Sequence, residues 1–236
     1  MKKLVSMVMA LCIAMLLPLS QILAFNDDQP NGVMPEMAPL DRSFPDITYD
    51  RHKLGISPYG QQGTSYGAPA ACQVILAKHG IYMTQKQIAQ ELGTTNNGTA
   101  VGGIPAFLNR KIGWSQYPKS GEAGYRLGKI SSHGDEDENV LWNHILQSVK
   151  YGDPIIFLID TSYFDSNNPG MKYVVSNGYR IGNLPYPGGK DSGTWRDIVY
   201  FDTDPKEYDA TFGYEKAEFM RTFMDAMVSA GGYYIW

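Results

Sequence analysis

The 236-residue chain contains few of the residues that usually hold metals or form disulfides. It has two cysteines, and because Cys12 lies in an apolar run near the N-terminus, a chain cut after that run keeps only Cys72 and cannot form an internal disulfide. It has four histidines, which are scattered: His52, His79, His133 and His144. One cysteine and four scattered histidines do not give the ligand spacing of a zinc site, and we expect no metal and no other cofactor.

An excess of positive charge is also lacking. The chain has 20 basic and 24 acidic residues, and removal of residues 1–24 takes Lys2 and Lys3 with it, which changes the net charge from −4 to −6. Proteins that bind nucleic acids or anionic membranes need basic patches. We therefore expect neither partner for the processed chain, and the oligomeric state stays open.

Long apolar runs are missing except for one at the N-terminus. The basic pair Lys2 and Lys3 is followed by an apolar run from Leu4 to Leu17 and by small residues that end at Ala24. This order predicts a secretory signal peptide over residues 1–24, and hence a secreted or extracytoplasmic bacterial protein. A retained membrane anchor is the alternative, although the run is short for a spanning helix.

The rest of the chain divides into a linker and one domain. Four prolines lie among Asp, Asn and Gly in residues 25–50 (Pro30, Pro35, Pro39 and Pro45), and this composition predicts an extended linker or prosegment. Residues 51–236 have the length of a single domain.

Within that domain, apolar spacing and end signals predict helices first and strands later. The expected helices cover residues 69–78, 84–92, 104–112, 138–150 and 214–228. The expected strands cover residues 154–160, 173–176, 197–201 and 233–236. This order is typical of an α+β domain.

Several segments resemble, in order, those of the C39-like branch of the papain-fold cysteine peptidases. The first is the helix start Gln61 to Leu76, which reads QQGTSYGAPAACQVIL. The others that carry the resemblance are 87–109, the Gly-Asp-Pro at 152–154, Lys172 to Tyr179 (KYVVSNGY) and Val199 to Asp202. The resemblance implies a papain-like fold in which N-terminal helices pack on a C-terminal antiparallel sheet.

The same resemblance places the family's catalytic positions on this chain. The nucleophilic Cys falls on Gly67 and the His falls on Lys172, whereas the acid is kept as Asp202 or, on the Asp-Pro pair, as Asp204. The Gln that helps to bind the oxyanion falls on Gln61 or Gln62. The two residues that perform the chemistry are therefore replaced, and those that orient and polarise remain.

Cys72 is the only cysteine near the replaced nucleophile. Five helical residues turn a side chain roughly 140° away and move it about 7.5 Å along the axis, so Cys72 lies at the wrong place for a thiol at the helix start. Its apolar stripe predicts a buried and inert thiol. Two alternatives stay open: an active cysteine peptidase that uses Cys72, and a Ser65 or Thr64 nucleophile with Lys172 as a base of depressed pKa.

We expect a secreted C39-like protein that is catalytically degenerate and binds a peptide or protein in the inherited cleft. The alternative functions are an active cysteine peptidase that uses Cys72 and a structural domain without an open groove. We also expect Lys172 to pair with Asp202 and to attract acidic groups of a ligand.

Overall fold

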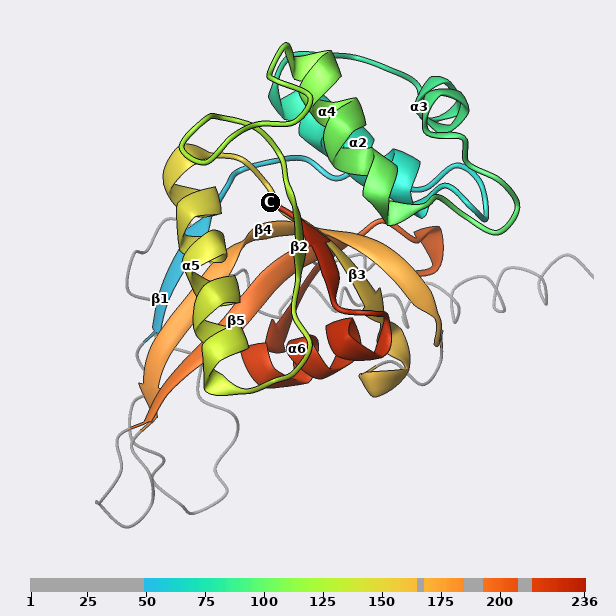
Figure 1. Ribbon diagram of the computed structural model, residues 1–236. Coiled ribbons are helices and arrows are strands. Elements are labelled where there is room, and N and C mark those ends of the chain that lie inside the picture. The colour runs from blue at the N-terminus through green and yellow to red at the C-terminus, as the bar shows by residue number, and fades with distance from the viewer. Residues whose placement is uncertain (1–48, 165–167, 185–192, 208–213) are drawn as a thin grey trace, which may run out of the picture. The chain divides into compact units, whose positions relative to one another are not determined.

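The computed structural model describes residues 49–164, 168–184, 193–207 and 214–236 (Figure 1). The α-helices are α2 (Gly67–Lys78), α3 (Gln85–Leu92), α4 (Ile104–Ile112), α5 (Asp135–Tyr151) and α6 (Met220–Ser229). The strands are β1 (Tyr49–Lys53), β2 (Leu127–Lys129), β3 (Ile156–Asp160), β4 (Met171–Leu184), β5 (Gly193–Asp202), β6 (Glu215–Phe219) and β7 (Tyr233–Ile235). Short 3₁₀ turns are η1 (Val101–Gly103), η2 (Thr161–Tyr163) and η3 (Pro205–Glu207).

The strands form one antiparallel sheet in the order β2-β7-β3-β4-β5-β6. The long strand β4 is its centre, because β3 pairs with residues 171–175 and β1 pairs with residues 178–182 of β4. A register shift in β4 between Ser176 and Gly178 separates these two partners. Gly178 has φ 141°, and a Cβ there would lie 1.8 Å from the carbonyl oxygen of His52, so only glycine lets β1 approach this closely.

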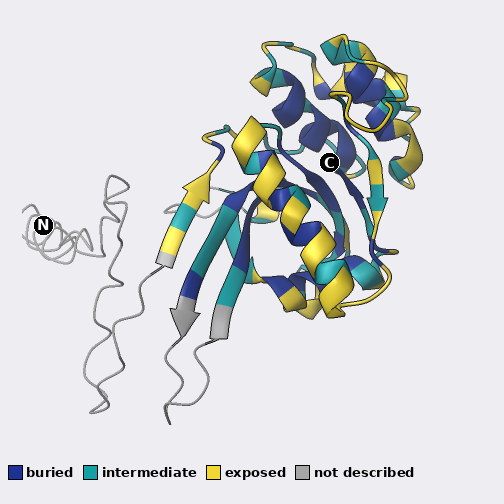
Figure 2. Ribbon diagram, turned by 60° about the vertical axis from the view of Figure 1, so that its left-hand side comes forward, coloured by how far each residue is buried: buried dark blue, intermediate teal, exposed yellow. Residues whose placement is uncertain are grey.

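The sheet is buried on both faces, because helices cover each of them (Figure 1). Side chains alternate along the strands: Phe157 and Val174 pack with α5 and α6, whereas Ile156 and Val175 pack with α2 and α4. The molecule thus has three layers over this region, and α5 exposes its outward face along its length (Figure 2).

Helix α2 packs directly on β4 through small residues. Ala68, Ala70, Ala71 and Cys72 are all buried in its first half. Short side chains let the helix axis come close to the sheet, so the start of α2 meets the start of β4. This contact positions the residues that the sequence identified as the remnant of a catalytic site.

The predicted α+β class, with N-terminal helices on an antiparallel sheet, is confirmed. Four of the five expected helices and all four expected strands are present, α4 with the expected ends and the others with shifted ends. The predicted helix over 214–228 is wrong in its first part, because Glu215–Phe219 forms β6 and pairs with β5. The carboxylate of Glu215 accepts hydrogen bonds from Arg51 and Asn177, and these tertiary contacts override the helix preference of Glu, Lys and Ala.

The sequence missed β1 and β2, which are short edge segments. Strand β1 begins at Tyr49, two residues before the first residue of the expected domain. The predicted signal peptide, and the predicted linker up to residue 48, lie outside the described residues. Among the helices that are described, none has the length and apolar character needed to cross a membrane.

Candidate functional site

A cavity of about 500 Å³ lies at the start of α2, and we call it the polar cavity. Five parts of the chain line it: the loop before α2 with Gln61, the turn over residues 96–99, β3 with Leu158, the start of β4 with Lys172, and the end of β5 with Asp202. The fold therefore brings the predicted positions Gln61, Gly67, Lys172 and Asp202 together around one space.

Gly67 is the first residue of α2 and leaves room where a nucleophile would stand. A Cβ built on Gly67 would lie 3.4 Å from Oε1 of Gln61 and 3.7 Å from the backbone nitrogen of Tyr173, which are ordinary contacts. The backbone could thus carry a side chain at this position without rearrangement. Gly67 thus begins the helix with no side chain directed into this space.

Of the two candidate glutamines, Gln61 faces this space. Its backbone N–H donates to the carbonyl of Thr203 (2.7 Å), and its side-chain amide donates to the carbonyl of Thr64 (3.2 Å). Gln62 is exposed, does not line the polar cavity, and its backbone N–H donates to the buried side chain of Gln85 (2.8 Å). The structure therefore places Gln61, and not Gln62, beside Gly67.

Lys172 and Asp202 form the expected ion pair. Asp202 is the register partner of Val174, and Lys172 lies two residues before Val174, so both side chains leave the sheet on the same face. Nζ of Lys172 is 3.2 Å from Oδ2 of Asp202, 3.0 Å from Oε1 of Glu207 and 3.6 Å from Oδ2 of Asp204. We call these four residues the charge cluster.

The charge cluster keeps Lys172 protonated. Burial alone would lower the pKa of Lys172, but the carboxylates of Asp202 and Glu207 outweigh it and raise that pKa above its usual range. Burial raises the pKa of Asp202, whereas hydrogen bonds from Lys216, Asn168 and Lys172 overcome burial at Glu207 and lower its pKa to about 2.

Both candidate acids lie in the polar cavity, and the structure gives them different surroundings. Asp202 is closed off, with 3% of its side chain exposed, whereas Asp204 is 20% exposed. Oδ1 of Asp202 accepts the backbone N–H of Asp204 (3.0 Å), so the two carboxylates are coupled through the chain. Burial alone would raise the pKa of Asp204, but hydrogen bonds from the Lys206 N–H and the Asn168 amide, together with the positive charge of Lys172, outweigh burial and lower that pKa.

The structure gives the alternative nucleophiles the following surroundings. Cys72 is completely buried among apolar side chains, and burial raises the pKa of its thiol well above the usual range. The Ser65 hydroxyl donates to the carbonyl of Asn96 (2.9 Å) and does not contact Lys172. The depressed pKa that a lysine base would need at Lys172 is contradicted by the raised pKa there.

No histidine lines the polar cavity within the described part of the chain. His79 lies 3.3 Å from Asp153, His133 lies 2.6 Å from Asp225, and His52 packs on the ring of Tyr179. His144 contacts the hydroxyl of Tyr234 (2.9 Å) and stacks on Trp236, and burial lowers its pKa to about 4. Each histidine thus has a structural contact of its own.

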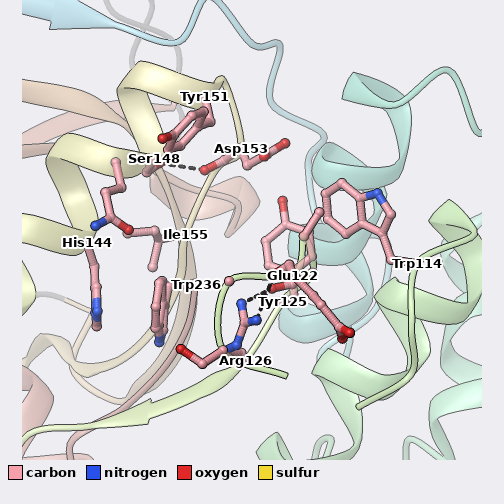
Figure 3. Close-up of a pocket in the computed structure, with 15 residues that line it drawn as sticks. Trp114, Glu122, Tyr125, Arg126, His144, Ser148, Tyr151, Asp153, Ile155 and Trp236 are labelled. Carbon is pink, nitrogen blue, oxygen red and sulfur yellow. Dashed lines mark hydrogen bonds between the residues drawn. The ribbon is translucent and has the colours of Figure 1, made fainter. Parts of the chain in front are cut away.

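A larger cavity of about 850 Å³ contains none of the predicted site residues (Figure 3). Its walls include the rings of Trp114, Tyr125, Tyr151, His144 and Trp236, and we call it the aromatic cavity. Its size makes it a general candidate for ligand binding. It lies away from Gly67, because none of the residues that line it also lines the polar cavity.

The sequence missed two residues of the cluster region, Glu207 and Asn168. Asn168 donates a hydrogen bond to Asp204 (3.1 Å) and another to Glu207. Glu207 is the last residue of the short turn η3, which begins at Pro205 of the Asp-Pro pair. That pair was the one sequence feature that could have indicated a turn close to the predicted acid. In the described residues, no group of histidine, cysteine or acidic side chains is arranged to hold a metal ion.

Comparison with known protein families identifies one family that matches this chain. The model of a family described as the Peptidase_C39 like family matches residues 53–226, which is more than half of the chain. Among solved structures, the peptidase domain of Streptococcus ComA, described as a bi-functional ABC transporter involved in a quorum-sensing pathway, superposes with a TM-score of 0.44 and 13% identity. That superposition covers 76% of this chain and 95% of the ComA domain, and at this level the assignment rests on the family model. No curated protein matches the chain.

Proposed function

The chain belongs to the Peptidase_C39 like family, and on that premise we propose that it is a secreted, catalytically degenerate member that binds a peptide or protein in the polar cavity. One observation carries the proposal: the cavity is open at the start of α2, yet its nucleophile position is Gly67 and its base position is Lys172. A space shaped by the family's elements is thus present with neither a thiol nor an imidazole in its described lining.

The absence of peptide cleavage follows from the chemistry of these two positions. Cysteine peptidases need a thiolate and an imidazole that transfers a proton near neutral pH. Gly67 offers no nucleophile, and Lys172 holds its proton within the charge cluster. Cys72 cannot replace the nucleophile without leaving the core, because its sulfur has no access to solvent.

Binding is supported by what the polar cavity retains. Gln61 still lies beside the helix start, and the backbone of residues 96–99 forms one wall. The Tyr173 hydroxyl donates to the carbonyl of Thr99 (2.8 Å) and the Ser65 hydroxyl to that of Asn96 (2.9 Å), which fixes this wall on β4 and on the loop before α2. A purely structural domain would be expected to fill such a space with side chains.

Export is the second part of the proposal. It rests on the basic pair, the short apolar run and the small residues up to Ala24. Intact mass measurement of the protein from the culture medium or the cell envelope tests it. A mass that lacks residues 1–24 is expected, and a mass that retains them in the cytoplasm would overturn it.

Selection from a degenerate peptide library tests binding, and mass spectrometry of the same peptides tests cleavage. The purified protein should enrich a subset of peptides and return them intact. Gly67→Trp should abolish enrichment, because an indole at this position fills the polar cavity from the helix start. Gly102→Trp is the matched control, since a Cβ at Gly102 meets nothing within 4 Å and Gly102 does not line the cavity.

Two outcomes contradict the proposal. Cleaved peptides, with cleavage lost in Cys72→Ser, would show an active thiol enzyme. Equal enrichment by the protein and by the Gly67→Trp variant would show that peptides do not bind in the polar cavity. Thermal unfolding of each variant shows whether a loss of binding reflects a loss of folding.

A further inference from the structure

The charge cluster leaves the polar cavity with a surplus of negative charge. Lys172 faces the three carboxylates of Asp202, Asp204 and Glu207, and Lys216 is the second described ammonium group in contact with them, through Glu207. Counted over the described residues alone, three carboxylates against two ammonium groups leave one negative charge. The remaining polar side chains that line the cavity are uncharged: Gln61, Thr64, Ser65, Asn96, Asn97, Thr99, Asn168, Tyr173 and Thr203.

Lys172 is not available to a ligand, although it occupies the histidine position. Its ammonium group donates hydrogen bonds to Asp202 (3.2 Å) and Glu207 (3.0 Å), lies 3.6 Å from Asp204, and belongs to a side chain that is only 11% exposed. An acidic ligand group would have to displace one of these partners and would also meet the surplus negative charge. The expectation that Lys172 attracts acidic groups therefore does not fit the cluster.

Asp204 is the carboxylate that a ligand can reach. It lines the polar cavity and is 20% exposed, compared with 3% for Asp202 and 7% for Glu207. Each of its oxygens has one hydrogen-bond donor, Lys206 N–H on Oδ1 and the Asn168 amide on Oδ2, and each oxygen has two lone pairs. One acceptor site on each oxygen thus remains for a donor from outside.

We propose that the polar cavity selects peptides that carry a cationic group, a lysine or arginine side chain or a free amino terminus, and that Asp204 contacts this group. The inference rests on the proposed function, since it concerns the ligand of the same site. A peptide cation matches the surplus charge without displacing Lys172. A metal ion does not fit, because the ammonium of Lys172 already occupies the space between the carboxylates.

The test uses degenerate dodecapeptide pools and the purified protein. One pool has acetylated amino termini and the other has free ones, so that side-chain and terminal cations are separated. Lysine and arginine should be enriched at least threefold over aspartate and glutamate in the acetylated pool, or free termini should be preferred over acetylated ones by a similar factor. Affinity for a selected peptide should fall as salt rises, because salt screens the attraction.

Asp204→Asn then tests the contact itself, with Asp135→Asn as the matched control. Both changes remove one negative charge, but Asp135 lies exposed at the start of α5 and does not line the polar cavity. Asp204→Asn should lower the affinity for a selected peptide about tenfold, and Asp135→Asn should leave that affinity unchanged. For a selected peptide that contains lysine, replacement of that lysine by norleucine should reduce the affinity for the unchanged protein. It should reduce the affinity for the Asp204→Asn variant much less, because the two changes remove the same contact.

The outcomes separate this inference from the proposed function. Enrichment without a preference for cations, or a cation preference that Asp204→Asn leaves intact, would overturn the inference while peptide binding stands. No enrichment beyond that of the Gly67→Trp variant would overturn peptide binding in the cavity, and the inference with it.

Discussion

The two ends of α2 border two different cavities. At its start, Gly67 lies in the polar cavity of about 500 Å³ beside the charge cluster. At its end, the cap residue His79 contacts Trp114 and Asp153, which line the aromatic cavity of about 850 Å³. The larger space is walled by rings, and the smaller one by charges and amides.

The larger of the two cavities is therefore not the one that contains the predicted site residues. A papain-like mechanism needs a helix start, where the dipole stabilises a thiolate, and a strand that brings a base to it. Only the smaller cavity has both elements. The aromatic cavity has a histidine, but burial against Trp236 lowers its pKa to about 4 and keeps it neutral near pH 7.

The largest expected effect is the gain of a reactive thiol at the start of α2. Gly67→Cys combined with Lys172→His should give native protein whose alkylation by iodoacetamide is at least about a hundredfold faster than that of the unchanged protein, because Cys72 is buried and a thiol at the helix start is accessible and favoured as thiolate.

Mass spectrometry measures this alkylation, and two further variants serve as controls. Gly67→Cys alone should react more slowly than the double variant, since no imidazole then pairs with the thiol. Gly102→Cys provides the rate of an ordinary exposed thiol. A double variant that reacts no faster than Gly102→Cys would mean that the polar cavity no longer has the family's geometry.

The next effect concerns stability. Lys172→Met leaves three carboxylates together without their central cation and should lower the free energy of unfolding by roughly 3 to 5 kcal/mol at pH 7. Lys111→Met removes a salt bridge to Glu91 at the surface and should lower the free energy of unfolding by less than about 1 kcal/mol. Urea titration compares the two variants.

The loss in Lys172→Met should shrink at low pH. Protonation of the carboxyls removes their repulsion, and Glu207 keeps Lys216 and Asn168 but loses Lys172, the third group that lowers its pKa. A loss that is the same at pH 4 and pH 7 would show that packing, and not charge, is what Lys172 contributes.

A smaller effect is expected at the aromatic cavity. The pKa of His144 is lowered to about 4, so the unfolded chain takes up a proton near pH 6.5 that the folded chain refuses until about pH 4. His144 thus stabilises the fold above pH 6.5, and this contribution should be lost as the pH falls from 6.5 towards 4. NMR titration of the imidazole should give the midpoint, and a midpoint near 6.5 would contradict its burial against Trp236.

The smallest expected effect tests whether the two cavities are independent. Trp114→Ala enlarges the aromatic cavity and should leave the affinity of a selected peptide unchanged within about twofold, because Trp114 does not line the polar cavity. Fluorescence anisotropy with a labelled peptide measures it. A change as large as that caused by Gly67→Trp would show that peptides bind at the ring-walled end of α2.

Local signals predicted most of the fold. Helix α3 begins with a capping box formed by Thr84 and Gln87, whose spacing is a local helix-start signal, and α4 spans Ile104–Ile112 as expected. The acidic run at 135–138 forms the first turn of α5. Strand β6 could not be predicted in this way, because Glu215 and Lys216 favour a helix locally and take a strand only through pairing with β5.

The sequence by itself determined the residues at the two positions, Gly67 and Lys172, onto which the resemblance places the family's Cys and His, because residue identity needs no structure. Only the tertiary structure decided what surrounds these two residues. Lys172, Asp202, Asp204 and Glu207 meet because β4 and β5 pair and η3 turns back beside them, and their charges act over a few ångströms in a buried setting. Spacing along the chain cannot report such distances, so the sign of the cavity's charge became visible only in the folded protein.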